Sequence, residues 1–383
     1  MMTRNNMTQN KIQFQKELLE NRIAKNLKNL KKWARKNRIT CYRIYDKDIP
    51  EIPLAIDIYS FLPDHIDDKI SLARFIGMVN DAVSANSKEG LEFIEQEKKR
   101  TYIHMYLYER PYEKNAEEED QWLLEMKKTI AKVTGIDEER VIIKHRRKQT
   151  DGEKRSQYEK ISSEKTIRGL VQEQGQFFIV NLSDYIDTGL FFDHRPLRKI
   201  VREESAGKRV LNLFCYTGSF SVYAAEGNAS FVESVDLSNT YIEWARTNMS
   251  RNGFDSKDKF KYTTNDVFEF LEIKSKSTNE NNVEKYDLIV LDPPTFSNSK
   301  KTRNTLNINR DWPKLVELCA SILNPKGTLY FSTNSRELKF EEKKIPAGFS
   351  CTDISQKTIP EDYRNQKIHR VWKIVRTEEI KCL

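Results

Sequence analysis

The sequence contains few cysteines, and they are not arranged in pairs. Cys41, Cys215, Cys319, Cys351 and Cys382 are an odd number, scattered over 383 residues, and no two of them form a Cys-x-x-Cys pair. Disulfide-rich secreted domains and cysteine-ligated zinc sites both need closely spaced cysteines. We therefore expect reduced thiols and no metal site.

Long apolar runs are also missing. No stretch approaches the roughly 20 apolar residues that a membrane-spanning helix needs, and the N-terminus lacks the apolar segment of a signal peptide. We therefore expect no membrane partner and a cytoplasmic location.

The composition, in contrast, is rich enough in apolar residues to build sizeable cores. Hydrophobic residues make up 38% of the chain, with 19 Phe and 16 Tyr, whereas disordered chains have few aromatic residues. A chain of this length usually divides into two or three units. The net charge of +8 is spread over both halves, with 34 Lys and Arg against 29 Asp and Glu in residues 1–180 and 31 against 28 in the rest. An anionic partner would therefore have to be bound by local clusters.

The first 175 residues predict a flexible tail over residues 1–10 and a small α+β domain over residues 11–175. Apolar residues recur every three or four positions between Leu19 and Ala34, which is the period of an amphipathic helix. Strand-like runs follow at residues 42–45, 53–59, 102–108 and 141–144, with a helix near residues 120–133. Residues 66–98 read as a helical or loop insertion.

Two basic clusters in this region are candidates for binding RNA. Residues 11–38 hold ten Lys and Arg against two Glu, and we select Lys28, Lys32 and Arg35 as phosphate contacts. A solvated helix face is an equally open interpretation. The second cluster is a basic loop that is followed by an aromatic residue, a combination suited to phosphate contact and base stacking; a plain solvated loop also remains open. Its selected residues are Arg146, Arg147, Lys148 and Tyr158.

Residues 176–383 alternate strand and helix patterns. An apolar hairpin is expected over residues 177–193, a helix after Pro196, and helices near residues 219–226, 238–252 and 312–323. Alternation of this kind predicts a doubly wound α/β sheet. Two final runs, residues 349–354 and 369–375, predict an antiparallel terminal pair, which is usual in class I (Rossmann-like) methyltransferases. The expected sheet strands are residues 210–214, 231–236, 260–263, 288–291 and 328–332.

The end of the first of these strands carries a turn with a single glycine, Tyr216-Thr217-Gly218. In an open α/β sheet the ligand crevice lies where such a strand ends. Asp236 ends the next strand, where a carboxylate can accept both ribose hydroxyls of a nucleoside. The turn lacks the G-x-G-x-x-G run that cradles a pyrophosphate, which argues against NAD and favours a nucleoside without phosphates.

Two further strand ends carry polar residues. Asn265-Asp266 can hold an adenine amino group, although a helix N-cap before Val267 explains the same residues. The fourth strand ends in Asp292-Pro293-Pro294-Thr295-Phe296, where two prolines restrict the backbone. Phe296 is then placed to stack on an extruded base.

Three segments together resemble the RlmK family of 23S rRNA guanine-N7 methyltransferases, which also occurs as one half of a fused bifunctional enzyme. They are residues 181–195 (NLSDYIDTGLFFDHR), residues 211–218 and residues 292–300 (DPPTFSNSK). Shorter similarities at residues 21–22, 31–35, 41–46 and 157–158 extend the resemblance over nearly the whole chain. The fused enzyme's other half is absent from this sequence, so we expect a stand-alone enzyme.

The resemblance implies methyl transfer from S-adenosylmethionine to N7 of a guanine in the peptidyl-transferase region of 23S rRNA, with S-adenosylhomocysteine as product. Naked rRNA and a large-subunit assembly intermediate both remain open as the partner, and Lys300 joins the expected RNA contacts. The expected catalytic residues are Asp292, Pro293, Pro294, Phe296 and Asn334. The expected cofactor site comprises Asp193, His194, Arg195, Phe214, Tyr216, Thr217, Gly218, Asp236, Leu237, Asp266, Val267 and Asp292.

The sequence departs from the family in three places: residues 66–98, residues 332–335, where the family has two asparagines and a lysine, and a polar insertion within residues 271–285. We expect these differences to alter RNA docking more than chemistry.

Guanine N7 carries a free lone pair, so in-line displacement needs positioning and neither a general base nor a covalent intermediate. Cytosine-C5 chemistry needs a cysteine nucleophile, and no cysteine comes directly after the Pro-Pro turn or after the fifth expected strand. Two alternatives stay open: methylation of an exocyclic guanine-N2 amine, and a non-catalytic RNA-binding assembly factor that keeps the fold.

Overall fold

The structure, a computed structural model, describes residues 4–66, 68–108, 115–146, 166–185, 187–279, 285–297 and 305–377. The chain forms two compact units, Met1–Thr188 with Glu361–Asn365, and Gly189–Pro360 with Gln366–Leu383. No helix in the described part of the chain has the length and apolarity to cross a membrane. The units divide at Thr188/Gly189 and not at 175/176, because the hairpin that precedes this point packs with the first unit.

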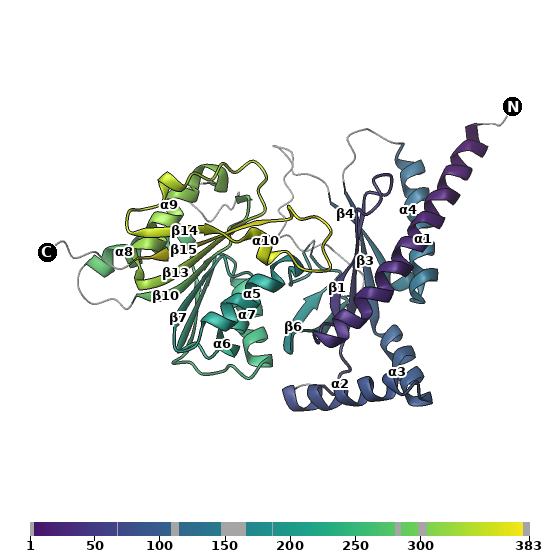
Figure 1. Ribbon diagram of the computed structural model, residues 1–383, viewed down its shortest axis with the longest axis horizontal. Coiled ribbons are helices and arrows are strands. Elements are labelled where there is room, and N and C mark those ends of the chain that lie inside the picture. Colours follow the sequence, from purple (N-terminus) through teal and green to yellow (C-terminus); the bar gives the residue numbers. More distant parts are fainter. Residues whose placement is uncertain are drawn as a thin grey trace. The chain divides into compact units, whose positions relative to one another are not determined.

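The first unit is built on a four-stranded sheet in the order β1-β2-β3-β4. Only β3 and β4 run parallel; the other neighbours are antiparallel. Helices α1 and α4 pack side by side on this sheet (Figure 1). The 3₁₀ turn η1 (Glu138–Arg140) precedes β4. The bounds are α1 (Arg4–Lys36), β1 (Cys41–Asp46), β2 (Leu54–Ser60), β3 (Thr101–Tyr108), α4 (Ala116–Thr134) and β4 (Val141–Arg146).

Helix α1 confirms the predicted amphipathic pattern but begins earlier than expected. Leu19, Ile23, Leu27 and Ala34 are buried against the sheet and α4. The helix already runs from Arg4, so the prediction of a flexible tail over residues 1–10 was wrong for residues 4–10. Polar residues without a periodic apolar face can still extend a helix that is nucleated by a packed segment downstream.

The insertion at residues 66–98 forms a helical hairpin, α2 (Lys69–Ser84) and α3 (Lys88–Lys99). Asp68 caps α2 in a reciprocal capping box with Ser71. A Cβ on Gly90 would lie 2.3 Å from the carbonyl oxygen of Ala82, so glycine is required where the two helices meet. The hairpin region has a small core of its own, made of Leu62, Ile66, Leu72 and Phe177.

The hairpin before the catalytic unit lies earlier than predicted. It consists of β5 (Arg168–Glu173) and β6 (Gln176–Asn181) and does not span residues 177–193. Its turn residues Gln174 and Gly175 both have positive φ. Strand β6 ends at Asn181, whose side-chain oxygen accepts hydrogen bonds from the backbone N–H groups of Ser183 and Asp184.

The second unit confirms the predicted doubly wound sheet. Its seven strands have the order β14-β15-β13-β10-β7-β8-β9. The five from β13 to β9 are parallel, and β15 runs antiparallel to both β13 and β14. The strands are β7 (Arg209–Leu213), β8 (Phe231–Asp236), β9 (Phe260–Thr264), β10 (Tyr286–Leu291), β13 (Leu323–Thr333), β14 (Phe349–Asp353) and β15 (Arg370–Arg376).

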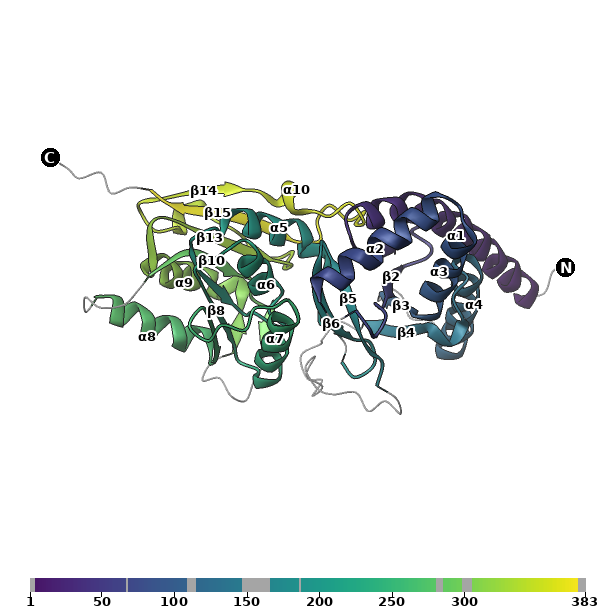
Figure 2. The same cartoon turned by 90° about the horizontal axis from the view of Figure 1, so that it is seen from below.

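Helices cover both faces of this sheet (Figures 1 and 2). Helices α5 (Arg195–Glu204), α6 (Ser219–Glu226) and α7 (Asn239–Arg251) pack together on one face. Helices α8 (Val267–Asn279) and α9 (Ile308–Ser321) pack together on the other. Helix α8 continues to Asn279, so much of the predicted polar insertion is helix. The short elements are η2 (Phe192–His194), β11 (Phe296–Ser297), β12 (Leu306–Asn307), η3 (Glu342–Lys344) and α10 (Ser355–Thr358).

Candidate active site

The candidate active site lies at the carboxyl ends of the parallel strands of the second unit. Strand β7 is central, and the chain proceeds to β8 on one side of it and to β10 on the other. In an open α/β sheet this reversal of strand order creates the ligand crevice. The loops that follow β7, β8, β9 and β10 carry Gly218, Asp236, Asp266 and Asp292 to that edge.

The turn after β7 adopts an unusual backbone. Phe214, Tyr216 and Gly218 have φ values of 53°, 50° and 76°, a region that costs non-glycine residues free energy and is concentrated at functional sites. Gly218 also packs closely against α7, because a Cβ there would lie 2.7 Å from the Cβ of Ala245.

Asp236 ends β8 beside this turn. Its Oδ2 accepts a hydrogen bond from the Tyr216 N–H at 3.0 Å, and its Oδ1 accepts one from Ser238 N–H at 2.9 Å. Burial raises the pKa of Asp236 to about 6 and outweighs these backbone hydrogen bonds. A partly desolvated carboxylate with remaining lone pairs suits the hydroxyl groups of a ribose, and the adjoining Leu237 is half-buried.

The predicted adenine-binding pair after β9 is first of all a helix cap. Asp266 Oδ1 accepts a hydrogen bond from Glu269 N–H at 3.1 Å, and Asn265 Oδ1 accepts one from Asp266 N–H at 2.8 Å. The alternative explanation from the sequence, an N-cap on α8, is therefore confirmed. Val267 is buried in the core of the unit, so only its backbone can reach a ligand.

Four side chains from distant parts of the chain form an ionic network at the end of β10. His194 Nε2 lies 3.3 Å from Asp292 Oδ2, and His369 Nδ1 lies 3.4 Å from Asp193 Oδ2. The two imidazole rings stack, with centroids 4.7 Å apart and planes 8° from parallel. Ser332 donates a hydrogen bond of 2.5 Å to Asp292 Oδ1.

This network shifts the titration of its members. Burial alone would lower the pKa of His194, but the carboxylates of Asp292 and Asp193 outweigh burial and raise it. Burial would likewise raise the pKa of Asp292, yet His194 and Ser332 hold it below its usual range. The pKa of Asp193 is lowered against burial by His194, His369 and Arg198. The carboxylates therefore favour the protonated form of His194, and the imidazole favours the ionised form of Asp292.

The same cluster contains residue types that can bind a metal ion. Ligand atoms of Asp193, His194 and His369 all lie within 4.8 Å of one another, the one such group in the part of the chain that the structure describes. His369 Nε2 is already 2.9 Å from Thr358 Oγ1, and its other nitrogen faces Asp193. Ion pairing and hydrogen bonding account for this arrangement, and we assign it no metal.

The loop after β10 presents its aromatic residue outward. Pro293 is buried and Pro294 half-buried, whereas Phe296 is 50% exposed. Thr295 donates a hydrogen bond of 2.7 Å to the side-chain oxygen of Asn334, which follows β13. Asn334 is exposed and thereby joined to this loop. An exposed ring on a loop that is restrained from both sides suits stacking.

Three of the predicted cofactor residues also make contacts within the protein. Arg195 is buried at the start of α5. Thr217 is fully buried; its hydroxyl donates to the Gly189 carbonyl at 2.5 Å, and its own carbonyl accepts from Asn248. Phe214 packs against the core of the unit.

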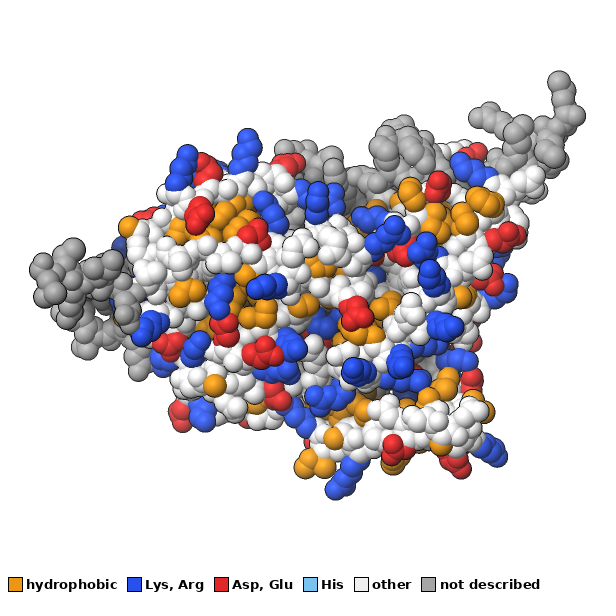
Figure 3. Space-filling model, viewed as in Figure 1, with side chains coloured by type: hydrophobic (Ala, Val, Ile, Leu, Met, Phe, Trp, Pro, Cys, Tyr) orange, Lys and Arg blue, Asp and Glu red, His pale blue; other side chains and the backbone are white. Residues whose placement is uncertain are grey.

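The predicted RNA contacts on α1 differ in exposure. Lys28 and Lys32 are exposed and Arg35 is half-buried on α1; Figure 3 shows Lys and Arg side chains gathered over this helix. The backbone of Arg146 lies in β4. Four predicted contacts, Arg147, Lys148, Tyr158 and Lys300, lie outside the described residues.

Sequence reasoning missed one member of the ionic network, His369, and the Ser332 hydroxyl that donates a hydrogen bond to Asp292. Ser332 was noted only as part of a departure from the family. His369 directly precedes β15, whose antiparallel register pairs Arg370 with Thr333. This register places His369 at the edge of the sheet where the candidate active site lies. The predicted pairing of the terminal strands could therefore have located His369.

Comparison with known proteins agrees with this geometry. The family described as S-adenosylmethionine-dependent methyltransferase matches residues 93–341. The chain belongs to this family. Its cofactor is therefore S-adenosylmethionine. Among solved structures, a candidate S-adenosylmethionine-dependent methyltransferase from Streptococcus mutans superposes with a TM-score of 0.63 at 19% identity, covering 94% of this chain and 81% of that one, which shows the shared fold.

Two relatives are similar in sequence over most of this methyltransferase. Ribosomal RNA large subunit methyltransferase K of Neisseria meningitidis serogroup B is 40% identical over 354 residues, which cover 92% of this chain and 86% of that protein. Ribosomal RNA large subunit methyltransferase K/L of Pseudomonas putida (strain W619) is 38% identical over 359 residues, 94% of this chain. The match spans 42% of the length of that fused relative.

Proposed function

We propose that this methyltransferase transfers a methyl group to N7 of a guanine in 23S rRNA. The observation that carries the choice of N7 is the state of Asp292. Its carboxylate is occupied by Ser332 and His194, and its pKa is lowered by His194 despite burial. A carboxylate of this kind is a weak proton acceptor, which suits a nucleophile that has no proton to lose.

In the proposed reaction S-adenosylmethionine supplies an electrophilic methyl group on a positively charged sulfur. Asp236 accepts the ribose hydroxyls, and the backbone around Asp266 meets the adenine. Phe296 stacks on the guanine and restrains its plane. Asp292 and Asn334 hold the guanine edge or the methionine moiety. Alignment of nucleophile, methyl carbon and sulfur supplies the rate enhancement, because positioning alone is worth several kcal/mol.

The substrate is supported by the similarity to ribosomal RNA large subunit methyltransferase K and K/L. Helix α1 is basic, so its charge is complementary to that of an RNA partner. Cytoplasmic rRNA, either free or in a large-subunit assembly intermediate, is the proposed substrate. Guanine N2 is less well supported, since its amine must lose a proton and Asp292, the carboxylate on the loop that carries Phe296, is a weak proton acceptor.

The deciding experiment maps the methylated atom. The purified protein is incubated with 23S rRNA that lacks the modification and with S-adenosylmethionine, and the nucleosides are separated by chromatography and mass spectrometry. We expect N7-methylguanosine, which is recognised by its fixed positive charge. Recovery of N2-methylguanosine instead would replace the proposal. Absence of methyl transfer to both free 23S rRNA and a large-subunit assembly intermediate, while S-adenosylhomocysteine still binds, would favour an assembly factor.

A further inference from the structure

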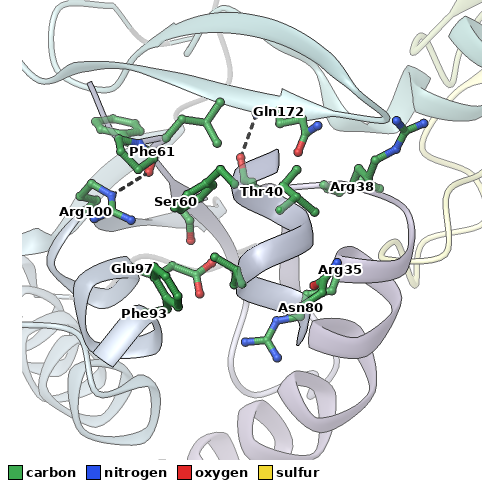
Figure 4. Close-up of a pocket in the computed structure, with 16 residues that line it drawn as sticks. Arg35, Arg38, Thr40, Ser60, Phe61, Asn80, Phe93, Glu97, Arg100 and Gln172 are labelled. Atoms are coloured by element: carbon green, nitrogen blue, oxygen red, sulfur yellow. Dashed lines mark hydrogen bonds between the residues drawn. The ribbon is translucent and has the colours of Figure 1, made fainter. Parts of the chain in front are cut away.

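The first unit contains a pocket that the proposed reaction does not use. It encloses about 640 Å³, with open solvent at its mouth included. Four parts of the unit line it: the end of α1, the end of β2, the α2–α3 hairpin and β5. Figure 4 shows Gln172 and Arg38 above this space and Phe93, Glu97, Arg35 and Asn80 below it.

Three aromatic side chains line the pocket. Phe61, Phe75 and Phe93 all line it, and the rings of Phe75 and Phe93 meet edge to face at 6.2 Å. All three are only half-buried, so they retain surface that a ligand can cover. Base stacking on aromatic side chains tolerates any base, because every base has a π face.

Three arginines also line the pocket, and one of them, Arg100, lies beside Phe61. Arg35, Arg38 and Arg100 line the pocket with one acidic residue, Glu97. Arg100 donates a hydrogen bond to the Phe61 carbonyl at 3.3 Å, and burial lowers the pKa of its guanidinium. A partly desolvated guanidinium is stabilised by an anion, and arginine recognises phosphate with two parallel hydrogen bonds.

The lining also includes a buried hydrogen-bond acceptor without a partner. Gln172 is 1% exposed, and its backbone N–H donates to Thr40 Oγ1 at 2.8 Å. Its side-chain Oε1 has no hydrogen-bond partner in the described part of the protein. An unsatisfied buried acceptor destabilises the fold, and the amino and imino groups of nucleobases would satisfy it.

Arg38 has a backbone conformation that glycine adopts more easily than other residues. It follows the end of α1 with a φ of 55°, the left-handed conformation in which helices commonly end on glycine. A Cβ on Gly175 would lie 3.1 Å from the Arg38 guanidinium. The Arg38 side chain is therefore present at a position where a non-glycine residue strains the backbone.

Two glycines allow the elements that line the pocket to pack closely. Gly90 allows α3 to approach α2, and a Cβ on Gly169 of β5 would lie 2.3 Å from the Phe61 ring. The α2–α3 hairpin supplies Phe75 and Phe93. This hairpin therefore completes the pocket.

We propose that this pocket binds one unstacked nucleotide of a single-stranded RNA. The base lies against Phe61, Phe75 and Phe93 with its edge toward Gln172, and the adjoining phosphates lie on the three arginines. The exposed Lys28 and Lys32 precede Arg35 on the same face of α1 and continue the cationic track for the flanking backbone. This inference rests on the proposed function only in taking RNA as the substrate.

The test titrates the full-length protein with a short single-stranded oligoribonucleotide of mixed sequence. Duplex RNA, the four mononucleotides and inorganic phosphate serve as comparison ligands. The variants are Arg38→Gly, Gln172→Leu and Phe93→Ala. The matched control is Arg74→Ala, because Arg74 is exposed on α2 and does not line the pocket. The same oligonucleotide with a photoreactive uridine locates the bound base by mass spectrometry of the crosslinked peptide.

We expect each pocket variant to weaken binding of the single strand about tenfold, the value of one stacked base or charged contact. Arg38→Gly and Gln172→Leu should unfold at an unchanged or higher temperature, since one relieves left-handed strain and the other removes an unpaired acceptor. Crosslinks should fall on α3 or β5, and Arg74→Ala should bind as the wild type does.

Unchanged affinity in all three variants, crosslinks elsewhere, or equal binding of mononucleotides and the oligomer would overturn the inference. The outcome is separable from the proposed function. If the pocket binds the single strand but no guanine N7 is methylated, the proposed reaction fails and the pocket stands. If all three variants methylate rRNA with wild-type kcat and KM, the pocket assignment fails and the reaction stands.

Discussion

The imidazole Nε2 of His194, at the start of the second unit, lies 3.3 Å from the carboxylate Oδ2 of Asp292 at the end of β10. This pair joins the segment before α5 to the loop that carries Phe296. It fixes the orientation of Asp292 and keeps it ionised, so the first residue of the Asp-Pro-Pro-Thr-Phe loop acts as a fixed acceptor.

We predict that His194→Gln lowers stability in a pH-dependent manner. The pKa of His194 is raised from 6.5, so its contribution is complete below about pH 6.5 and is lost as the pH rises through the raised value. The pKa of Asp292 is lowered from 3.8, so its contribution is lost only as the pH falls below that value. Urea unfolding should show a deficit of about 2 kcal/mol near pH 6 that shrinks by pH 9.

The matched control for this prediction is Ser332→Ala, which removes an uncharged hydrogen bond to the same carboxylate. Its deficit should be equal at pH 6 and pH 9. A His194→Gln deficit that also stays constant would mean that His194 acts through packing alone.

We predict that binding of S-adenosylhomocysteine weakens as the pH falls through about 6. Burial raises the pKa of Asp236 to about 6, and the protonated acid loses the charge with which it accepts ribose hydroxyls. Calorimetry between pH 8 and pH 5 should show the loss. Asp236→Asn should bind about tenfold more weakly at pH 8 and vary little with pH, whereas Asp266→Asn should keep the wild-type pH dependence. A flat wild-type profile would remove Asp236 from the ribose site.

Phe296→Ala should reduce methyl transfer to rRNA by about tenfold or more, since stacking one base is worth about 1–3 kcal/mol. The side chain is half exposed, so the free energy of unfolding should change little. Phe296→Tyr keeps a ring and should retain most activity, and both variants should bind S-adenosylhomocysteine normally. Full activity of Phe296→Ala would exclude the stacking role.

Gly218→Ala should destabilise the second unit by about 2 kcal/mol or more, because it combines a positive φ with overlap against α7. Adding Ala245→Gly should recover part of the loss, since it relieves the overlap but not the φ. Denaturant unfolding of both single variants and the double variant measures this coupling. Strict additivity would show that Ala245 is not the obstacle.

Lys28→Ala with Lys32→Ala should weaken RNA binding and reduce its salt dependence. Each lysine that contacts a phosphate releases about one counterion, so the slope of log K against log salt should become shallower by about 1 to 2. The control pair is Lys257→Ala with Lys276→Ala, two exposed lysines of the second unit. Equal slopes for the two double variants would assign the basic face of α1 to solvation.

Parts of the site could be predicted from sequence because local rules determine them. Parallel strands deliver their carboxyl ends to one edge, so the polar residues after β7, β8, β9 and β10 had to converge. A turn with one glycine excluded a pyrophosphate. Residues 4–10 and the start of the β5–β6 hairpin were misread, because helix extension and a Gln-Gly turn leave no strong periodic signal.

The sheet, the order of the acidic strand ends and the amphipathic face of α1 could be predicted because each depends on neighbours within a few residues. Three contacts became visible in the folded protein alone. Gly218 packs against Ala245, Asp292 is held by His194 beside His369, and the α2–α3 hairpin, the end of α1 and β5 surround Gln172. These contacts join residues far apart in the chain, and packing, burial and charge act on them through space rather than along the sequence.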